Sequence, residues 1–283
     1  MLSISISDSC IKCGKCVKVC PAAILKQEKP TDKAHVVDEQ KCIVCGHCVA
    51  ACPTSSVIHS EFPEEKVHHI SRETLPTPEQ VMLLCKSRRS NRAFTKQQVP
   101  EELLNSILEA AHRAPTASNM QQVEFTLITD PELIKQVTDI TINVFTSLAK
   151  KLSLIKPVVK AFMPDVYKLF PQFAKLKKEH AQGNDPIMRK ATALIFIHTP
   201  EKSRFGMQDS NLAYQNGSLM AESLGVSQFY TGFICTAIKM DRKKRIEKLF
   251  GIKGKIHAGL ALGMPAFKFP NYIDKKDIVV TRF

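Results

Sequence analysis

The sequence predicts an α+β fold in which a small cysteine-rich domain precedes a larger α/β domain of layered helices and strands. Three observations support this prediction. The chain has 283 residues, which is more than the roughly 100 to 200 residues of one domain. Eight of its ten cysteines lie within the first 52 residues. The remaining sequence contains both helical and extended hydrophobic periods. We therefore expect one domain at 1–60, a linker at 61–77 and a second domain at 78–283.

Composition limits the class of protein. The 44% hydrophobic and 24% charged residues are ordinary for a globular chain. No apolar run reaches the roughly 20 residues that a membrane span requires, and the segment from Met1 to Cys10 lacks the features of a signal peptide. We therefore expect a soluble cytoplasmic protein. The net charge of +13 would suit a nucleic-acid partner, but no nucleic-acid-binding motif accompanies it, and we expect no such partner.

The N-terminal cysteines form an internal repeat with an offset of 32 residues, from Cys10 to Cys42. Each half reads C-x2-C-x2-C-x3-C-P, and Pro21 and Pro53 follow the last cysteine of each half. The eight cysteines are Cys10, Cys13, Cys16, Cys20, Cys42, Cys45, Cys48 and Cys52. Because bacterial iron–sulfur proteins use this spacing, residues 1–60 resemble the two-cluster bacterial ferredoxin family.

That resemblance implies two [4Fe-4S] clusters whose ligands cross between the halves. One cluster would be held by Cys10, Cys13, Cys16 and Cys52, and the other by Cys20, Cys42, Cys45 and Cys48. Gly14 and Gly46 would let each loop approach its cluster without a side chain in the way. Disulfides are disfavoured in a reducing compartment. Zinc sites are disfavoured because they use paired C-x2-C units without a third cysteine or a proline.

The segment 61–77 is polar and contains Pro63 and Pro76, which favours a linker. Its end predicts a helix, because Thr77 can cap a helix that has Pro78 at its first position and Gln80 three residues after the cap. Cys85 in this helix, like Cys235 further along, has no cysteine near it in sequence, and we expect both to be reduced core residues.

A basic cluster follows this helix in the segment S-R-R-S-N-R-A-F, residues 87–94. Arginine forks and serine hydroxyls suit a phosphorylated cofactor, although a solvated basic turn is the competing interpretation. A helix is then predicted from about Pro100 to Arg113, and it ends in the loop A-P-T-A-S-N-M-Q, residues 114–121. Alternating apolar residues at 123–127 predict a strand after the loop.

Together, these two motifs resemble the nitroreductase family of FMN proteins. The resemblance implies a nitroreductase-like α/β sandwich that forms a homodimer, with FMN at the dimer interface. In the family, the arginine motif binds the phosphate, the ribityl chain and the ring of FMN, the loop reaches it from the partner subunit, and a later backbone segment lies against the ring. The matching residues are Arg88, Arg89, Ser90 and Arg92, then Pro115, Thr116, Ala117 and Asn119, and then Tyr230, Thr231 and Gly232.

The C-terminal region continues the resemblance. We expect a buried strand at 191–198, a helix at 209–224 capped by Asp209, a helix at 241–250 capped by Asp241, and a strand at 258–264. After the last strand, Lys268 matches the family's closing signature G-x-P-x-x-K. Asn271 stands where the family usually has a further arginine, so phosphate contact at this end would rest on Lys268 alone or recruit Lys275. We expect no catalytic side chain, because the cofactor supplies the chemistry.

The segment 148–190 is strongly basic, with ten Lys or Arg residues against three acidic ones. Its apolar residues predict short amphipathic helices broken by Pro157, Pro164 and Pro171. In the family, this region covers the flavin and shapes the substrate pocket. The alternatives are a cover coated by lysine side chains and a docking surface for an acidic electron-carrier protein.

The two resemblances together imply an FMN-dependent reductase that receives electrons one at a time and delivers two. We expect an external low-potential donor such as ferredoxin rather than NAD(P)H, since a hydride donor needs no clusters. The expected acceptor is a small organic molecule, such as a nitroaromatic, a quinone or an activated alkene. An alternative is an electron-transfer module whose acceptor is a partner protein. A non-redox flavin sensor is disfavoured because it would not need eight cluster ligands.

Overall fold

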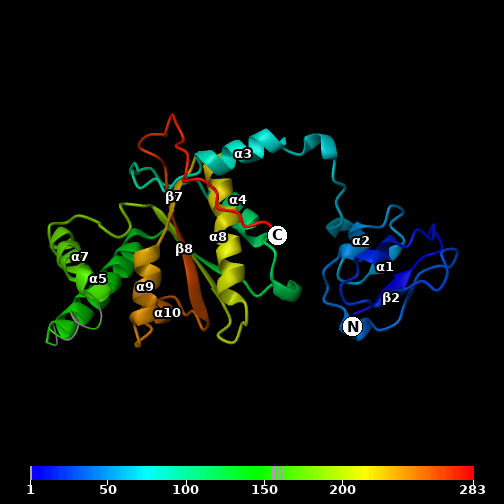
Figure 1. Ribbon diagram of the computed structural model, residues 1–283, viewed down its shortest axis with the longest axis horizontal. Coiled ribbons are helices and arrows are strands. Elements are labelled where there is room, and N and C mark those ends of the chain that lie inside the picture. The colour runs from blue at the N-terminus through cyan, green and yellow to red at the C-terminus, as the bar shows by residue number, and fades with distance from the viewer. Residues whose placement is uncertain (1, 155–156, 158–159, 161, 163) are drawn as a thin grey trace. The chain divides into compact units, whose positions relative to one another are not determined.

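The structure is a computed structural model that describes residues 2–154, 157, 160, 162 and 164–283. The chain divides into two units. The first comprises Met1–Pro76 together with Ala117–Met120, and the second comprises Thr77–Thr116 and Gln121–Phe283. Figure 1 labels the elements of both units. No helix among the described residues is long and apolar enough to cross a membrane.

Short strands and helices around two antiparallel strand pairs form the first unit. Its elements are β1 (Ile4–Ile6), α1 (Lys15–Val19), β2 (Leu25–Lys26), β3 (His35–Val36), η1 (Glu39–Lys41), α2 (His47–Ala50), β4 (Val57–His59), η2 (Glu64–Lys66), η3 (Arg72–Thr74) and η4 (Ala117–Asn119). Strand β1 pairs with β4, and β2 pairs with β3. Ile4, Ile24, Leu25 and Val57 form a small core, and two of the cysteines, Cys16 and Cys48, are buried in it.

The internal repeat is visible in the backbone of the first unit. Gly14 and Gly46, which directly precede α1 and α2, have φ values of 66° and 72°. Non-glycine residues also have positive φ at matching places, at Lys12 and Val44 and again at Ala23 and Ser55. Positive φ is uncommon outside glycine. Its recurrence at the 32-residue offset therefore indicates that both halves adopt the same loop conformation.

The second unit is built on a four-stranded antiparallel sheet in the order β5-β6-β8-β7. Its strands are β5 (Glu124–Ile128), β6 (Ala193–Thr199), β7 (Ser227–Tyr230) and β8 (Lys255–Gly263). Its helices are α3 (Pro78–Ser87), α4 (Glu101–His112), α5 (Pro131–Ser153), α7 (Pro164–Ala181), α8 (Gly206–Ser223), α9 (Gly232–Met240) and α10 (Arg245–Leu249). This mixture of sheet and covering helices confirms the α+β class predicted from the sequence.

Both faces of the sheet are buried. Along β6 the side chains alternate between two cores, with Leu194 and Phe196 in one and Ile195 and Ile197 in the other, as the period of a strand requires. Helices α4 and α8 pack over one face, and α5, α7 and α9 cover the other. In Figure 1, β8 runs between α8 and α9. The sheet is therefore the middle of three layers.

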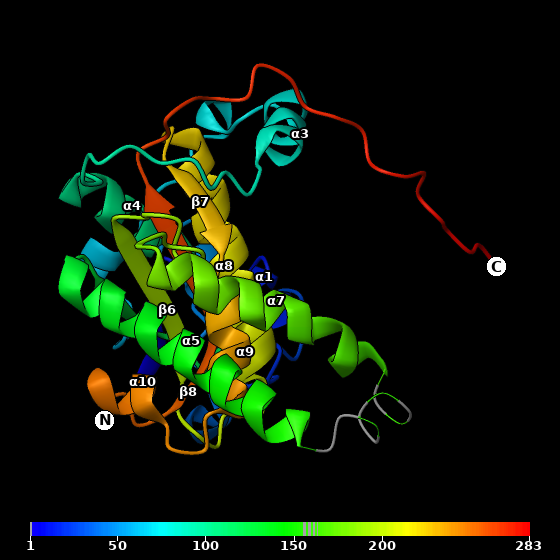
Figure 2. The same ribbon diagram turned by 90° about the vertical axis from the view of Figure 1, so that its left-hand side faces the viewer.

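Helices α5 and α7 lie side by side (Figure 2). The Phe145 and Phe173 rings stack with their centroids 4.9 Å apart, and His180 Nε2 lies 2.7 Å from Asp139 Oδ1. Pro171 lies inside α7, so the expected helix break at this proline is wrong. Pro164 instead begins the helix, as proline can at a first helical position. Ile155, Val158 and Met163, which belong to the predicted apolar set, lie outside the described residues.

The start of α3 matches the prediction from its local sequence signals. Thr77 caps α3 with a complete capping box, in which Gln80 N donates to Thr77 Oγ1 and Thr77 N donates to Gln80 Oε1. Helix α4 and strands β5, β6 and β8 also lie within a few residues of the predicted positions. Cys235 is buried as expected. Cys85 is exposed, so its expected place in the core is wrong.

Two predicted helix caps are wrong. Helix α8 begins at Gly206 with Phe205 at the cap, and Asp209 is buried within its first turn. Asp241 does not start a ten-residue helix. Its carboxylate instead accepts hydrogen bonds from Arg245 N and Arg245 Nε, and the helix is the short α10. An additional helix, α9, follows β7 directly, where the sequence analysis predicted no helix.

Candidate functional site

Two cavities in the first unit are lined by cysteines. About 350 Å³ of space at the first and about 310 Å³ at the second is free of protein atoms, part of it open to solvent. The first cavity is lined by Cys10, Cys13, Cys16 and Cys52, and the second by Cys20, Cys42, Cys45 and Cys48. Each cavity thus combines three cysteines from one half of the repeat with one cysteine from the other half.

Backbone amides point at several of these sulfur atoms. Lys12 N donates to Cys10 Sγ and Val44 N donates to Cys42 Sγ, both at 3.4 Å. Ser56 N donates to Cys52 Sγ at 3.1 Å. Such donors stabilise thiolates, which are the form of cysteine that binds metals. The positive φ values of Lys12 and Val44 belong to the same two loops.

The arrangement suits a metal–sulfide cluster better than a single metal ion. All ten cysteines are free thiols, so the disulfide alternative is not realised. In the part of the chain that the structure describes, no three His, Cys, Asp or Glu side chains come together as one metal ion requires. Four cysteines around one cavity, three from one half of the repeat and one from the other, are the donor set that a [4Fe-4S] cluster uses.

In the second unit, the arginine motif is fixed in place by a residue that the motif analysis did not single out. Asn91 is 6% exposed. Its Nδ2 donates to Ser227 Oγ at 2.9 Å and to the Phe267 carbonyl at 3.0 Å, and its Oδ1 accepts from Ala93 N. The side chain therefore ties the arginine loop to the start of β7 and to the segment after β8.

A second buried amide supports the same loop. Gln228, on β7, is completely buried. Its Nε2 donates to the Arg89 carbonyl at 3.3 Å, and its Oε1 accepts from the Tyr214 hydroxyl at 3.0 Å. Ser90 forms an isolated bridge with Gln228. A polar residue directly before Phe229 and Tyr230 is the sequence signal that could have identified Gln228.

The loop leads to a cavity in the second unit, where about 770 Å³ of space, part of it open to solvent, is free of protein atoms. Its lining includes four predicted residues, Arg92, Tyr230, Thr231 and Gly232. The Arg92 guanidinium lies over the Phe229 ring at 5.3 Å, and its Nη1 donates to the Ser90 carbonyl at 3.4 Å.

Arg189, from the end of the basic segment, adds a second cation to this cavity, and Phe229, Phe233 and Ile234 add apolar surface. Arg189 contributes to the positive charge of the 148–190 segment, but no local motif marks it as a residue of this cavity. Two arginines beside aromatic and aliphatic walls suit a ligand with an anionic group and a flat apolar body.

Strand β7 and helix α9 form one wall of this cavity, and the residues of this wall are closely packed against β8. Thr231 N donates to the Gly259 carbonyl at 2.9 Å, and any Cβ at Gly259 would clash with Thr231 Oγ1. The Tyr230 hydroxyl donates to the His257 carbonyl at 3.0 Å. Burial, with a smaller contribution from Cys235, raises the pKa of Tyr230 well above its ordinary value, so this phenol stays protonated at neutral pH and acts as a donor.

The other predicted residues lie elsewhere. Arg88, Arg89 and Ser90 form the end of α3 and the start of the loop, and Lys268 Nζ lies close to Gly225. None of these four lines the 770 Å³ cavity. Pro115 and Thr116 follow α4 outside it, while Asn271 and Lys275 are exposed.

Ala117 and Asn119 belong to the first unit. Within that unit, Asn119 Nδ2 donates to the carbonyls of Ile43 and Val44, at 3.1 and 2.7 Å. These two residues lie between Cys42 and Cys45 in the second cysteine loop.

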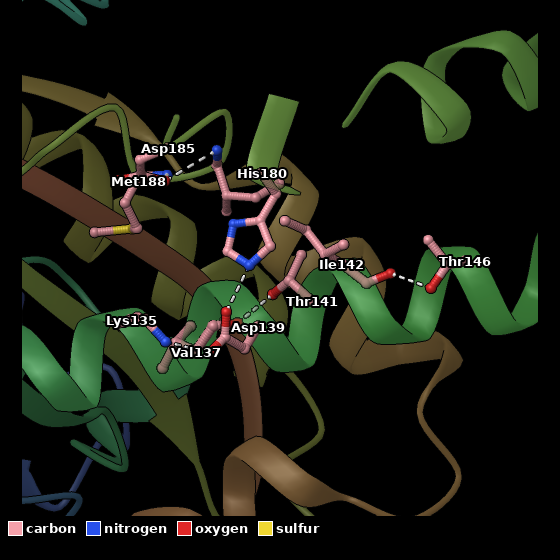
Figure 3. Close-up of polar contacts among 10 residues, drawn as sticks. Lys135, Val137, Asp139, Thr141, Ile142, Thr146, His180, Asp185 and Met188 are labelled. Carbon is pink, nitrogen blue, oxygen red and sulfur yellow. Dashed lines mark hydrogen bonds and ion pairs between the residues drawn. The ribbon is translucent and has the colours of Figure 1, made fainter. Parts of the chain in front are cut away.

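A larger cavity opens between α5, the end of α7 and the loop that follows it. About 1470 Å³ of space there, part of it open to solvent, is free of protein atoms. Its lining residues include Phe94, Ile134, Lys135, His180 and Asp185. Figure 3 shows His180 reaching from α7 toward Asp139 on α5. Lys135 Nζ lies 2.9 Å from the same carboxylate. Because His180 belongs to α7 and Asp139 to α5, the contact between these two side chains links the two helices.

Comparison with known proteins gives two family matches. Residues 85–264 match the model of the nitroreductase family, and residues 3–53 match the model of a 4Fe-4S dicluster domain.

Individual relatives agree with these matches. A protein of Archaeoglobus fulgidus, provisionally named NADH dehydrogenase/NAD(P)H nitroreductase, is 33% identical over 66% of this chain and 86% of its own length. A protein of the same name from Methanothermobacter thermautotrophicus is 27% identical over 66% of this chain and 78% of its own length. A crystal structure of a nitroreductase from Bacteroides fragilis with bound FMN superposes with a TM-score of 0.54 at 20% identity, covering 72% of this chain and 99% of that one. This last likeness shows a shared fold.

Proposed function

Because the chain belongs to the nitroreductase family and carries a 4Fe-4S dicluster domain at its N-terminal end, we propose that it is an FMN-dependent iron–sulfur oxidoreductase. It takes electrons from a low-potential donor and passes them through two [4Fe-4S] clusters and FMN to a small organic acceptor. The acceptor classes are nitroaromatics, quinones and activated alkenes. The observation that carries the proposal is the presence, in one chain, of two four-cysteine cavities and a cavity that holds two arginines.

The eight N-terminal cysteines are the cluster ligands in this proposal. Cys10, Cys13, Cys16 and Cys52 hold one cluster, and Cys20, Cys42, Cys45 and Cys48 hold the other, which agrees with the lining of the two cavities. The backbone donors of Lys12, Val44 and Ser56 stabilise the negative charge on the thiolates. Each cluster, when present, carries one electron at a time.

FMN, when bound, would take up single electrons from the clusters and deliver two to the acceptor, and the protein binds and orients it. Arg88, Arg89, Ser90 and Lys268 bind the phosphate and the ribityl chain. Arg92 places its positive charge where negative charge develops on the ring, and the backbone of Tyr230, Thr231 and Gly232 lies against the ring. Asn91 and Gln228 keep the arginine loop in position through buried hydrogen bonds.

We propose a homodimer in which Pro115, Thr116, Ala117 and Asn119 reach the partner subunit's FMN. Exposed apolar side chains support this part of the proposal. No residue of α3 is buried, and Val81, Met82 and Leu83 are 46%, 55% and 56% exposed. Ile278 and Val279 near the C-terminus are 89% and 94% exposed. Apolar surface of this kind is typical of an interaction site.

A count of cofactors tests the proposal. Protein purified without oxygen should show the absorbance of both iron–sulfur clusters and flavin. Iron and acid-labile sulfide should each be present in the amount of two cubanes per FMN. Colourless protein, or brown protein without FMN, would contradict the assignment. Changing Cys20 and Cys52 to serine one at a time should each damage one cluster, and the damaged cluster should differ between the two variants.

The proposed donor is an external ferredoxin, and the proposed location is the cytoplasm, where thiols stay reduced. The names of the two archaeal relatives make NAD(P)H the competing donor. Anaerobic stopped-flow mixing separates the two. Reduced ferredoxin should reduce the flavin in one fast phase that requires the clusters, while NADPH should reduce it slowly. Fast reduction by NADPH together with no reaction with ferredoxin would overturn the donor assignment.

The second candidate function is an electron-transfer module whose acceptor is a protein. It is favoured by exposed lysines on α7, namely Lys175, Lys177 and Lys178. Deleting the basic segment would be uninformative, because Phe173 and Leu176 of α7 belong to the core. Changing the three lysines to glutamate leaves these core residues intact. If this variant reduces small acceptors at the wild-type rate, the result supports the enzyme. If the variant loses a salt-sensitive complex that the wild type forms with an acidic partner protein, the result supports the electron-transfer module.

A further inference from the structure

His59 is a buried histidine beside one of the cysteine cavities. It ends β4, is 3% exposed, and lines the cavity that also contains Cys20, Cys42, Cys45 and Cys48. Its Nε2 lies 3.6 Å from Cys42 Sγ, and its ring packs against Phe62 with the centroids 4.8 Å apart. The imidazole is therefore held in one orientation, with one nitrogen directed at a cysteine sulfur.

The other ring nitrogen identifies the tautomer. Glu61 N donates a hydrogen bond to His59 Nδ1 at 3.1 Å. A nitrogen that accepts a hydrogen bond carries no proton, so the proton of the neutral ring is on Nε2. The Nε2–H group therefore donates to Cys42 Sγ. A sulfur acceptor allows the longer separation that is observed between the two atoms.

The first half of the repeat has no equivalent contact. The residue 32 positions before His59 is Gln27, and its Nε2 donates to the carbonyls of Lys12 and Asp32, at 3.0 and 2.7 Å. The backbone donors to Cys10 and Cys42 are matched in the two halves at 3.4 Å. Among the residues described, a histidine donor therefore lies beside the second cysteine loop and not beside the first, whose cavity has instead the contact of Thr54 Oγ1 with Cys52 Sγ at 3.8 Å.

We propose that His59 is a positioning residue that raises the reduction potential of the cluster bound by Cys20, Cys42, Cys45 and Cys48. The inference rests on the proposed cluster. In the step concerned, one electron from a low-potential one-electron donor enters this cluster, no bond is made or broken, and the cluster becomes one unit more negative. A hydrogen bond donated to a ligating sulfur stabilises the more negative state. Its removal therefore makes reduction harder.

The test is a redox titration with dithionite, followed by electron paramagnetic resonance on the intact protein. The His59→Phe variant keeps a ring against Phe62 and removes the N–H donor. One of the two cluster potentials should become more negative, while the other remains at its wild-type value. His35→Phe is the matched control, because His35 is exposed on β3 and lines neither cysteine cavity. Both potentials should remain unchanged in the control.

A second variant covers the case in which His59→Phe fails to assemble its clusters. His59→Gln places in the second half the residue that the first half carries at the equivalent position, and it should also lower one potential. Unchanged potentials in variants that retain full iron and sulfide would overturn the inference and leave the proposed function intact. Wild-type protein without clusters would instead contradict the proposed function.

Discussion

Arg92 is the residue on which the proposed flavin chemistry depends most directly. Its guanidinium lies over the Phe229 ring at the edge of the 770 Å³ cavity. A fixed cation beside a developing negative charge stabilises the reduced cofactor more than the oxidised one. Arg189, which lines the same cavity, supplies additional positive charge. The loss of Arg92 alone should therefore weaken the effect without abolishing it.

Steady-state turnover of the Arg92→Gln variant should be about 10- to 100-fold slower, because negative charge develops on the ring as the flavin takes up electrons, and removing a stabilising cation there costs rate of this order. The flavin potential should become more negative in the same variant. Steady-state kinetics and a redox titration give these two values. Arg113→Gln is the matched control, since Arg113 is an exposed residue paired with Glu109 on α4. Equal turnover rates for the two variants would contradict the proposed role of Arg92 at the flavin.

Asn91 gives a prediction about stability. Substitution by alanine leaves buried polar groups of Ser227 and the Phe267 carbonyl without their partner, which costs about 1 to 3 kcal/mol. Chemical denaturation should show this loss in the free energy of unfolding, and FMN should dissociate more readily because the arginine loop is released. Asn211→Ala is the control, because Asn211 is exposed on α8. An equally small loss for both variants would contradict the anchoring role.

The sequence could identify Arg92 and the cysteines because a local motif or spacing marks them. Asn91 and Arg189 could not be identified in the same way. The role of Asn91 depends on hydrogen bonds to residues far along the chain, and the place of Arg189 depends on where the end of the basic segment returns to the sheet. Such contacts arise from tertiary packing, which no local pattern reports. Gln228 is intermediate, because a polar residue in a buried strand is visible in the sequence.

Among the elements, α10 contains Glu247, a buried acid with one carboxylate oxygen that lacks a hydrogen-bond partner among the described residues. Glu247 is 7% exposed, and the oxygen concerned is Oε2. Burial raises the pKa of this carboxyl above its ordinary value. The folded state therefore holds the proton more tightly than the unfolded state. The free energy of unfolding is therefore reduced least by Glu247 at low pH, where the carboxyl is protonated. It falls as the pH rises through the raised pKa of this group.

The Glu247→Gln variant should consequently be more stable than the wild type by about 1 kcal/mol at pH 8, because the amide does not ionise. The gain should shrink as the pH falls toward the ordinary pKa of glutamate. Thermal unfolding across this pH range measures the difference. Glu109→Gln serves as the control, because Glu109 is largely exposed and its substitution should have a small effect. A gain that does not depend on pH would contradict the ionisation argument.

The elements also show where local signals fail. The start of α3 could be predicted because its capping box involves only neighbouring residues. Asp209 and Asp241 are aspartates, a residue type that often caps helices. Asp209, however, is buried within α8, and Asp241 pairs with Arg245. Pro171 does not end α7 because packing of Phe173 and Leu176 in the core outweighs the local cost of the proline. Tertiary contacts decided these three cases.

At the scale of the whole molecule, the exposed apolar face of α3 predicts a dimer. Leu83→Glu should shift the protein toward the monomer in light scattering coupled to size exclusion, because it places a charge in an apolar interface. FMN content should fall with it, since the proposed site needs residues of the partner subunit. Val37→Glu is the control, because it alters an isolated exposed residue of the first unit. A wild-type monomer that retains FMN would contradict the dimer.

The two cysteine cavities also have a consequence for the order of events during biosynthesis. Each cavity takes its fourth cysteine from the opposite half of the repeat, so neither half can enclose an inorganic group alone. The first cavity begins near Cys10 but is closed only by Cys52. A nascent chain must therefore expose Cys48 beyond the ribosome before the second metal centre can be completed, and Cys52 before the first can, so a truncation between these two cysteines should remove the fourth ligand of the first centre alone.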